Sequence, residues 1–339
     1  MTILVTGAAG FIGSYVSAAL LARGEQVIGV HNLNPYYDVA LKEARLAALL
    51  ADAGFTFQRL DLTERGALVE ACGDAGVDRM VHLAAQAGVR HSLTHPFDYE
   101  RANVAAHLEV LEFCRHQESF VHLVYASSSS VYGGNTKLPF SESDRVDTPV
   151  SLYAATKRSG ELMSHTYSHL YRLPATGLRF FTVYGPWGRP DMALFKFTNG
   201  ILDGKPIPVY NRGEMIRDFT YIDDIVEGVV RAIDRPPPLN ADHENKNDEV
   251  ASAAPYQIYN IGNGHPVPLM RYIQALEKAL DKKAQLELLP MQPGDVRATE
   301  ADISRLVSDL GYRPQIDVET GITRFVEWYC DYYGVQLGD

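Results

Sequence analysis

The sequence predicts an α/β fold, with a doubly wound parallel sheet in the first part of the chain and a smaller, mixed lobe in the second. Short apolar segments alternate with longer helical segments through the first half, as in sheets built from strand–helix–strand units. The first apolar segment runs into a glycine-rich turn, and the fifth ends in four serines. We therefore expect functional residues at the carboxyl ends of parallel strands.

Composition narrows the class of protein. A chain of 339 residues with 46% hydrophobic content can bury a full core. The net charge of -11 argues against a general nucleic-acid binder or a binder of anionic membranes, because both need basic surfaces. Cys72, Cys114 and Cys330 lack the paired spacing of a metal or redox site, so we expect no metal and a cytoplasmic location. The chain shows no run of about 20 apolar residues and no targeting segment before its first strand.

The glycine turn follows a buried strand at residues 3–5 and opens a helix that runs to about residue 23. Glycines let the backbone approach a pyrophosphate, whose charge then meets the helix N-terminus. This strand–turn–helix context favours dinucleotide binding over a mere tight turn, and so favours a Rossmann sheet. The turn places these residues at the predicted cofactor site: Gly7, Gly10, Phe11, Ile12 and Gly13.

The second strand, residues 26–30, ends at His31, Asn32 and Asn34. A dinucleotide fold usually places an acidic residue here for the adenosine ribose, and this chain has His31. A neutral imidazole can still hydrogen-bond a hydroxyl group, and no arginine follows at once to favour a 2′-phosphate. We therefore expect NAD rather than NADP.

Two further strands, at residues 55–57 and 79–83, extend the predicted cofactor site. Asp61 can accept from the adenine amino group or can cap a helix from Thr63, and both interpretations stay open. Small residues after the fourth strand let a ring or a sugar lie close to the backbone. A predicted helix over residues 96–116 follows. These segments bring the following residues to the site: Asp61, Leu62, Leu83, Ala84, Ala85, Gln86 and Asn103.

Tyr153 and Lys157 lie four residues apart on a predicted helix that Ser151 can cap. A free phenol has a pKa of about 10, so its use as a base at neutral pH requires stabilisation by roughly 4 kcal/mol. A neighbouring ammonium, together with an oxidised nicotinamide, can supply that shift. In a chain with 19 tyrosines the pair can also arise by chance, so its weight depends on the rest of the chain.

The fifth strand, residues 120–126, delivers four serines, 127–130, at its carboxyl end. They suggest a hydrogen-bonding shelf, although serines are also common in ordinary loops. We expect residues 1–182 to form the dinucleotide-binding domain, with later segments returning to it. Residues 183–339 then form the smaller lobe across a discontinuous boundary.

Elements of the second half are less regular. We expect a strand at residues 175–181, short strands at 207–210 and 218–222, and helices at 269–280 and 322–333. An earlier helix is expected at residues 36–52. Residues 235–256 carry three successive prolines and then mixed polar residues, which predicts an exposed loop.

Taken together, the glycine turn, the serine run, the Tyr153–Lys157 pair and Arg217-Asp218-Phe219 resemble the extended short-chain dehydrogenase/reductase family, and specifically its NAD-dependent nucleotide-sugar epimerases and dehydratases. The similarity covers nearly the whole chain. Residues 32–38 and 185–193 resemble the UDP-glucuronate 4-epimerases of that family. The resemblance implies NAD-dependent conversion of UDP-glucuronate to UDP-galacturonate through a transient 4-keto sugar.

The resemblance also implies residue roles. Ser128 would hydrogen-bond the sugar 4-hydroxyl, Tyr153 would take its proton, and Lys157 would hold the nicotinamide ribose and lower the tyrosine pKa. Arg189 would bind the sugar carboxylate; a surface arginine in a Pro/Gly loop is the alternative. Gln292 departs from the arginine of some galactose-type relatives. The implied substrate-binding residues are Arg90, Ser128, Ser129, Ser130, Thr182, Arg189, Pro208, Tyr210, Arg217 and Asp295.

Three other functions remain possible. A decarboxylase that forms UDP-xylose is disfavoured because related dehydratases and decarboxylases carry an acidic residue where this chain has Ser130. A 4-epimerase for neutral UDP-sugars would turn over UDP-glucose in preference to UDP-glucuronate. A regulator that only senses dinucleotide would have no need of an intact Ser–Tyr–Lys set. The helices near residues 98–116 and 151–171 resemble a four-helix dimer interface, so we expect a homodimer.

Overall fold

A parallel seven-stranded sheet forms the larger part of the molecule, which a computed structural model describes over residues 1–239, 254–292 and 294–337. The strand order is β11-β6-β5-β4-β1-β2-β3, so the chain reverses direction across the sheet between β1 and β4, where open sheets bind ligands. The strands are β1 (Thr2–Thr6), β2 (Gln26–Val30), β3 (Phe55–Gln58), β4 (Arg79–His82), β5 (His122–Ser128), β6 (Ala175–Phe180) and β11 (Tyr256–Ile261).

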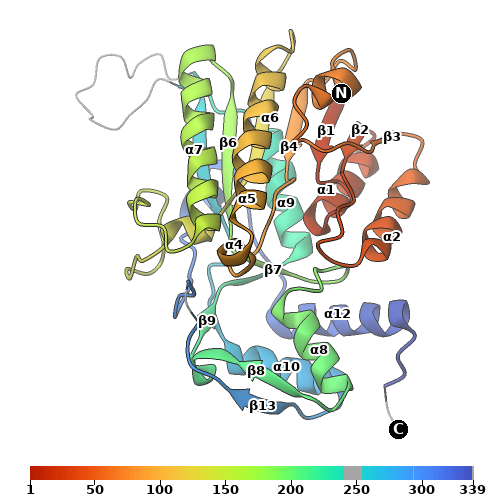
Figure 1. The fold of residues 1–339 in the computed structure, drawn as a ribbon, viewed down its shortest axis with the longest axis vertical. Coiled ribbons are helices and arrows are strands. Elements are labelled where there is room, and N and C mark those ends of the chain that lie inside the picture. The colour runs from red at the N-terminus through yellow and green to blue at the C-terminus, as the bar shows by residue number, and fades with distance from the viewer. Residues whose placement is uncertain (240–253, 293, 338–339) are drawn as a thin grey trace.

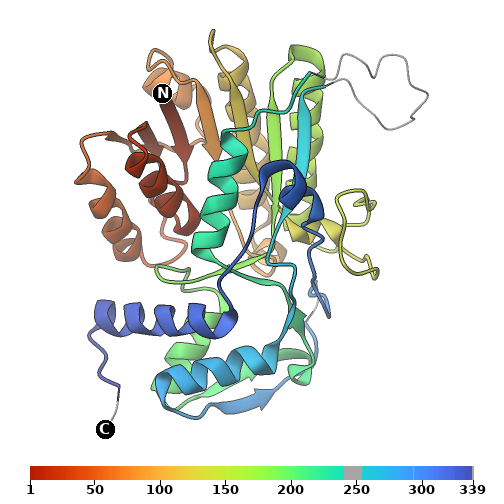
Figure 2. The ribbon, with the colours of Figure 1, turned by 180° about the vertical axis from the view of Figure 1, so that it is seen from behind.

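Helices cover both faces of this sheet (Figures 1 and 2). The helices of one face are α1 (Phe11–Ala22), α2 (Val39–Leu50) and α9 (Ile222–Ile233), and those of the other are α3 (Ala67–Cys72), α5 (Pro96–Glu100), α6 (Ala106–Arg115) and α7 (Leu152–Tyr171). Both faces of the central strands are therefore buried, which explains their nearly continuous apolar sequence. The doubly wound sheet is the predicted fold class.

Two elements of the larger part of the molecule, β11 and α9, come from beyond residue 182 in the sequence. Tyr256–Ile261 forms the edge strand β11, which pairs with β6, and α9 packs on α1. Neither element was expected from the sequence. The predicted loop at 235–256 ends where β11 begins, and its residues 240–253 lie outside the described part of the chain.

Two predicted helices differ from the observed ones. The helix expected at 36–52 begins only at Val39, where the Asp38 carboxylate accepts from the Ala40 N–H and caps it. The helix expected at 96–116 is preceded by α4 (His91–Thr94) and divided into α5, a π-helical turn at Arg101–Ala105, and α6. Such π turns often mark functional positions.

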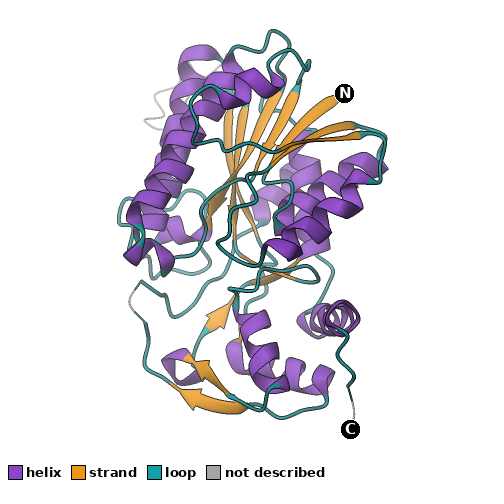
Figure 3. Cartoon of the chain, turned by 45° about the vertical axis from the view of Figure 1, so that its right-hand side comes forward, coloured by secondary structure: helices purple, strands orange, loops and turns teal. Residues whose placement is uncertain are grey.

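The smaller lobe lies beyond the carboxyl ends of the sheet strands (Figures 1 and 3). It contains short strand pairs that join distant segments, β7 with β10, β9 with β12 and β8 with β13. The remaining elements of the chain are β7 (Thr182–Tyr184), α8 (Ala193–Leu202), β8 (Pro206–Val209), β9 (Ile216–Arg217), β10 (Phe219–Tyr221), β12 (Val267–Pro268), α10 (Leu269–Leu280), β13 (Gln285–Leu288), α11 (Ser304–Leu310) and α12 (Val318–Tyr333).

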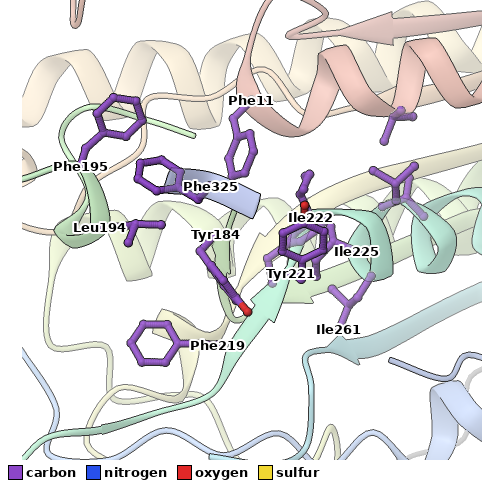
Figure 4. Close-up of a cluster of buried hydrophobic side chains, with 14 of the residues drawn as sticks. Phe11, Tyr184, Leu194, Phe195, Phe219, Tyr221, Ile222, Ile225, Ile261 and Phe325 are labelled. Atoms are coloured by element: carbon purple, nitrogen blue, oxygen red, sulfur yellow. The ribbon is translucent and has the colours of Figure 1, made fainter. Parts of the chain in front are cut away.

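One hydrophobic core extends from the sheet into the lobe (Figure 4). Phe11 of α1, Ile225 of α9 and Ile261 of β11 belong to the same buried cluster as Phe195 of α8 and Phe325 of α12. The position of the lobe relative to the strand ends is thus fixed by packing. Among the described residues, no helix combines the length and the apolar character needed to cross a membrane.

Candidate active site

A cavity of about 510 Å³ runs along the carboxyl ends of the sheet strands and toward the smaller lobe. It brings together most of the residues that the sequence predicted for the cofactor and the substrate. The predicted residues that line it are Gly7, Gly10, Phe11, Ile12, Gly13, His31, Asn32, Asn34, Asp61, Leu62, Leu83, Ala84, Ala85, Gln86, Ser128, Ser129, Ser130, Tyr153, Lys157, Thr182, Arg189 and Asp295.

The glycine turn has the shape that a diphosphate needs. Gly7 has φ +75°, and a Cβ atom there would lie 2.9 Å from the Ala84 nitrogen. A Cβ atom on Gly13 would lie 2.1 Å from the Gly7 carbonyl oxygen, so a larger residue would push the turn out of place. Gly10 precedes α1 and gives it no side-chain cap, which leaves the helix N-terminus open toward the cavity for an anion. These residues fit a dinucleotide.

His31 lies where the adenosine ribose is expected. Its Nδ1 accepts a hydrogen bond from the Leu33 N–H at 2.7 Å, so in the neutral ring Nε2 carries the proton and can donate. Burial lowers the pKa of His31 to about 4, and the charges of Lys42 and Arg45 act in the same direction. The ring is therefore a neutral donor at pH 7, suited to a hydroxyl group.

Asp61 makes the Thr63 bond of one interpretation left open by the sequence, together with a bond to Asn32 that neither interpretation included. One carboxylate oxygen accepts from the Thr63 N–H at 2.9 Å, and the other from the Asn32 amide at 2.9 Å. The first bond caps a turn, because the next helix begins only at Ala67. Asp61 nevertheless lines the cavity, so it can also face a ligand.

Asn103 does not line the cavity. It lies in the π-helical turn, and its amide accepts from the Gln86 N–H at 2.8 Å and donates to the Gln86 carbonyl oxygen at 3.0 Å. It also donates to the Thr156 hydroxyl at 3.1 Å. Asn103 thus fixes the loop that lines the cavity against the helix that carries Tyr153.

Tyr153 and Lys157 lie on the first turns of α7, where the Ser151 hydroxyl caps the helix by accepting from the Ala154 N–H. The Lys157 ammonium donates to the Ala126 carbonyl oxygen at 2.8 Å, which anchors α7 to β5. Burial lowers the pKa of Lys157 to about 8. Both side chains face the same cavity as Ser128.

The pKa of Tyr153 is shifted upward in the protein alone, whereas the sequence predicted that Lys157 would lower it. Burial raises the pKa of its phenol, while the Ser128 hydroxyl and the charge of Arg189 act to lower it. The Lys157 ammonium, which donates to the Ala126 carbonyl oxygen, does not offset this rise in the pKa. In the protein alone the phenol is therefore protonated at neutral pH, and ionisation needs further positive charge.

The four serines are divided between the end of β5 and a short 3₁₀ helix. β5 continues through Ser128, two residues beyond the expected end, and Ser129 and Ser130 begin a short 3₁₀ helix. The Ser127 hydroxyl is not part of a free shelf, because it donates to the Glu161 carboxylate at 2.6 Å. The Ser128 hydroxyl, by contrast, lines the cavity and accepts from the Ser130 N–H at 3.2 Å.

Glu161 is a buried residue that the sequence analysis missed. It lies one turn after Lys157 and accepts two hydrogen bonds from Arg179 of β6, at 2.8 and 2.9 Å. Burial acts to raise its pKa, but Arg179 and the other donors hold the pKa of Glu161 below its usual value. Through Arg179 and Ser127, Glu161 joins α7 to the strands β6 and β5. Its position four residues after Lys157 was the available signal.

Arg189 lines the cavity and is paired within the protein. Its Nε donates to one oxygen of Asp191 at 3.0 Å, and its Nη2 to the other at 2.5 Å. The loop that carries it is held by the buried Arg45 of α2, which donates to the carbonyl oxygens of Trp187 and Gly188. Arg45 went unnoticed in the sequence, although it stands on the apolar face of its helix.

The remaining predicted substrate residues surround Asp295 at the lobe end. Arg217 donates to its carboxylate at 2.7 Å, and the Arg90 guanidinium lies 3.9 Å from it and 4.5 Å from the Tyr210 ring centre. Arg217 and Asp295 line a second cavity, of about 140 Å³, together with Ser129, Ser130 and Thr182. Pro208 lies in β8 and lines neither cavity.

The parallel sheet, the glycine turn and the Ser–Tyr–Lys set define a dinucleotide-dependent enzyme of the short-chain dehydrogenase/reductase type. The chain belongs to the NAD dependent epimerase/dehydratase family, whose model matches residues 3–270.

Similar proteins agree with this assignment. A protein of Escherichia coli O111:H-, described as an uncharacterized 37.6 kDa protein in the cld 5′ region, is 55% identical over 99% of this chain and 100% of its own. A probable UDP-glucuronate 4-epimerase of Rhizobium meliloti is 48% identical over 98% of both chains. The UDP-glucuronic acid 4-epimerase of Bacillus cereus, solved with UDP-glucuronic acid and NAD, is 33% identical with a TM-score of 0.87, over 98% of this chain and 100% of that one.

Proposed function

We propose that this protein is an isomerase that converts UDP-glucuronate to UDP-galacturonate through a transient 4-keto sugar, with NAD as its cofactor. The observation that carries the proposal is one cavity that contains the Ser128, Tyr153 and Lys157 side chains together with Arg189. The first three suit oxidation and reduction at a hydroxyl carbon, and a guanidinium suits a sugar carboxylate. Relatives and solved structures named for this activity support the same conclusion.

The protein's residues divide the acid–base work. Bound NAD would supply the reversible hydride chemistry at sugar C4. Tyr153 removes the O4 proton as the ketone forms and gives it back as the alcohol is restored, so the residue is unchanged overall. Ser128 hydrogen-bonds the same oxygen, and Lys157 would hold the nicotinamide ribose. Because burial raises the pKa of Tyr153, the phenol would need the positive charge of the oxidised nicotinamide in order to act as the base.

The carboxylate end of the cavity limits side reactions. A 4-keto sugar acid is a β-keto acid, which loses carbon dioxide when the breaking bond aligns with the ketone orbitals. Arg189, with Ser129 and Ser130, would hold the carboxylate out of that alignment. Ser130 also leaves no acid at the position that related decarboxylases use, which disfavours decarboxylation.

We further propose that residues 1–182, with β11, hold the dinucleotide and that residues 183–339 supply most contacts to the uridine diphosphate. Arg217 would meet the diphosphate, and Asp295 the uridine ribose. Tyr210 and Pro208 would pack near the uracil, with Arg90 beside them. The existing Arg217–Asp295 bond would then be shared with the ligand or exchanged for it.

A homodimer is the assembly that the surface supports. The outer faces of α4 to α7 expose large apolar side chains on one side of the sheet, which a second copy would cover by a four-helix contact. These side chains are Leu93, Phe97, Leu108, Leu162, Leu170 and Tyr171. A cytoplasmic location, expected from the cysteines, stays a prediction.

A single incubation tests the proposed function. Purified protein with UDP-glucuronate and NAD should give UDP-galacturonate, identified by NMR, without release of carbon dioxide. Gas release with formation of UDP-xylose would establish a decarboxylase instead. Faster turnover of UDP-glucose than of UDP-glucuronate would establish a 4-epimerase for neutral sugars.

A further inference from the structure

Arg189 and Asp191 form an ion pair of which only the arginine lines the cavity. Both side chains are about one-fifth exposed, at 22% and 23%. Arg189 and the other donors hold the pKa of Asp191 low although burial opposes them, so the carboxylate is ionised at neutral pH.

Asp191 uses only one edge of the guanidinium. Its two oxygens accept from Nε and Nη2, which leaves the edge that carries Nη1 unused by this contact. A guanidinium has five N–H donors in a fixed plane, so it can bind a carboxylate on each of two edges. One edge is thus held by Asp191. Because Arg189 lines the cavity, a ligand there can bind the edge that Asp191 does not use.

Asp191 is itself fixed from a distant segment. The Tyr36 hydroxyl donates to the Asp191 oxygen at 3.3 Å, across 155 positions of sequence. Tyr36 stands in the stretch 32–38, and Asp191 in the stretch 185–193, which were the two most specific stretches of the sequence. Their side chains meet at this carboxylate.

The main chain of the arginine loop is held independently of Asp191. Trp187 has φ +59°, a conformation that costs free energy in a residue with a Cβ atom. Its ring packs against Trp328 and Tyr332 of α12, with centroids at 5.1 and 4.9 Å, and Arg45 binds its carbonyl oxygen. Loss of the Asp191 charge should therefore free the Arg189 side chain without displacing the loop.

We propose that Asp191, anchored by Tyr36, is a positioning residue that sets the selectivity of the site for sugar acids over neutral sugars. It holds the Nε and Nη2 edge of Arg189 so that the Nη1 edge meets the sugar carboxylate. This inference rests on the proposed function and deepens it. A neutral sugar makes no such contact, so it gains nothing from the arrangement.

The test compares Asp191→Asn with the wild-type enzyme on a charged and a neutral ligand. We expect the KM for UDP-glucuronate to rise about tenfold with kcat changed less than threefold. The reason is that the contact with the sugar carboxylate weakens equally in the ground state and in the transition state. Dissociation constants for UDP-glucose, measured by calorimetry with NAD present, should stay within twofold. Asp191→Glu should restore part of the loss, and Tyr36→Phe should give a smaller change in the same direction. Asp203→Asn, in an exposed pair with Lys205, is the matched control.

Any of four results would overturn the proposal. Equal weakening of UDP-glucuronate and UDP-glucose by Asp191→Asn would show a general structural role, and unchanged binding would show no role. Tighter binding of UDP-glucuronate by the variant would show that Asp191 competes for Arg189 instead of positioning it. Calorimetry also separates this proposal from the proposed function. If the wild-type protein prefers the sugar acid but forms no epimer, the proposed activity is refuted, while the binding comparison still decides the role of Asp191. If the wild-type protein does not prefer the sugar acid, this inference is overturned.

Discussion

The two ends of the cavity are built in different ways. The catalytic end stands on regular elements, with Ser128 at the end of β5 and Tyr153 and Lys157 on α7. The end that carries Arg189 stands on loops, where the distant Tyr36 and Arg45 hold Asp191 and the loop main chain. The first arrangement is fixed by helical spacing and buried main-chain contacts, and the second by individual side-chain bonds. Substitutions at the first end should therefore affect the chemistry, and those at the second the choice of substrate.

The substitution Tyr153→Phe tests most directly whether the catalytic end of the cavity carries the chemistry. Removing a positioned base typically costs 10²- to 10⁴-fold in rate, so we expect kcat to fall by about 10³-fold. The phenyl ring keeps most of the packing, so NAD binding should change little. Steady-state kinetics and calorimetric titration with NAD measure the two quantities.

Tyr171→Phe is the control for this change, because Tyr171 lies at the other end of the same helix and is half exposed. It should leave kcat unchanged. A Tyr153→Phe variant that retains activity within tenfold of the wild type would assign the base to another group.

The buried Glu161–Arg179 ion pair holds α7 against the sheet. Glu161→Gln removes the charge that faces the buried Arg179, and breaking one partner of such a pair costs about 3 kcal/mol or more of unfolding free energy. Urea unfolding should show this loss as a lower midpoint. Glu227→Gln, in an exposed pair with Arg231, should cost about 0.5 kcal/mol or less. Similar losses for both variants would show that α7 does not depend on this pair.

The same contrast explains what the sequence could predict. The glycine turn, the strand ends and the Tyr153–Lys157 spacing are local patterns, and the fold and most cavity residues followed from them. The bonds of Arg45 and Asp191 join segments more than 140 positions apart, and Glu161 meets Arg179 only because β6 lies beside β5. Such contacts depend on the finished fold. β11 was missed for the same reason, because its partner strand lies about 80 positions earlier.

A third prediction tests the burial of the catalytic end. Lys157 has a folded-state pKa of about 8, lowered by burial from 10.5, so its burial destabilises the fold below pH 8. Between pH 8 and 10.5 the unfolded chain binds the proton that the folded protein has lost, and stability therefore rises with pH. Relative to Lys157→Met, the wild-type protein should gain about 2 kcal/mol of unfolding free energy between pH 7.5 and pH 10. Urea unfolding without cofactor measures this difference at each pH. A difference that is constant with pH would show that the lysine is not desolvated.

The smallest effect should come from the ribose end, where a single neutral donor replaces the usual carboxylate. His31→Ala removes the Nε2–H donor, and a hydrogen bond between neutral groups contributes about 0.5–1.5 kcal/mol. We expect NAD to bind about 3- to 10-fold more weakly, with kcat at saturating NAD unchanged. Because the pKa of His31 is lowered to about 4, the ratio of wild-type to variant affinity should be the same at pH 6 and pH 8. Calorimetry at both values, with the exposed His265→Ala as the control, measures it. A ratio that grows toward acidic pH would mean that a charged imidazole binds the cofactor, contrary to the partly buried, neutral ring described above.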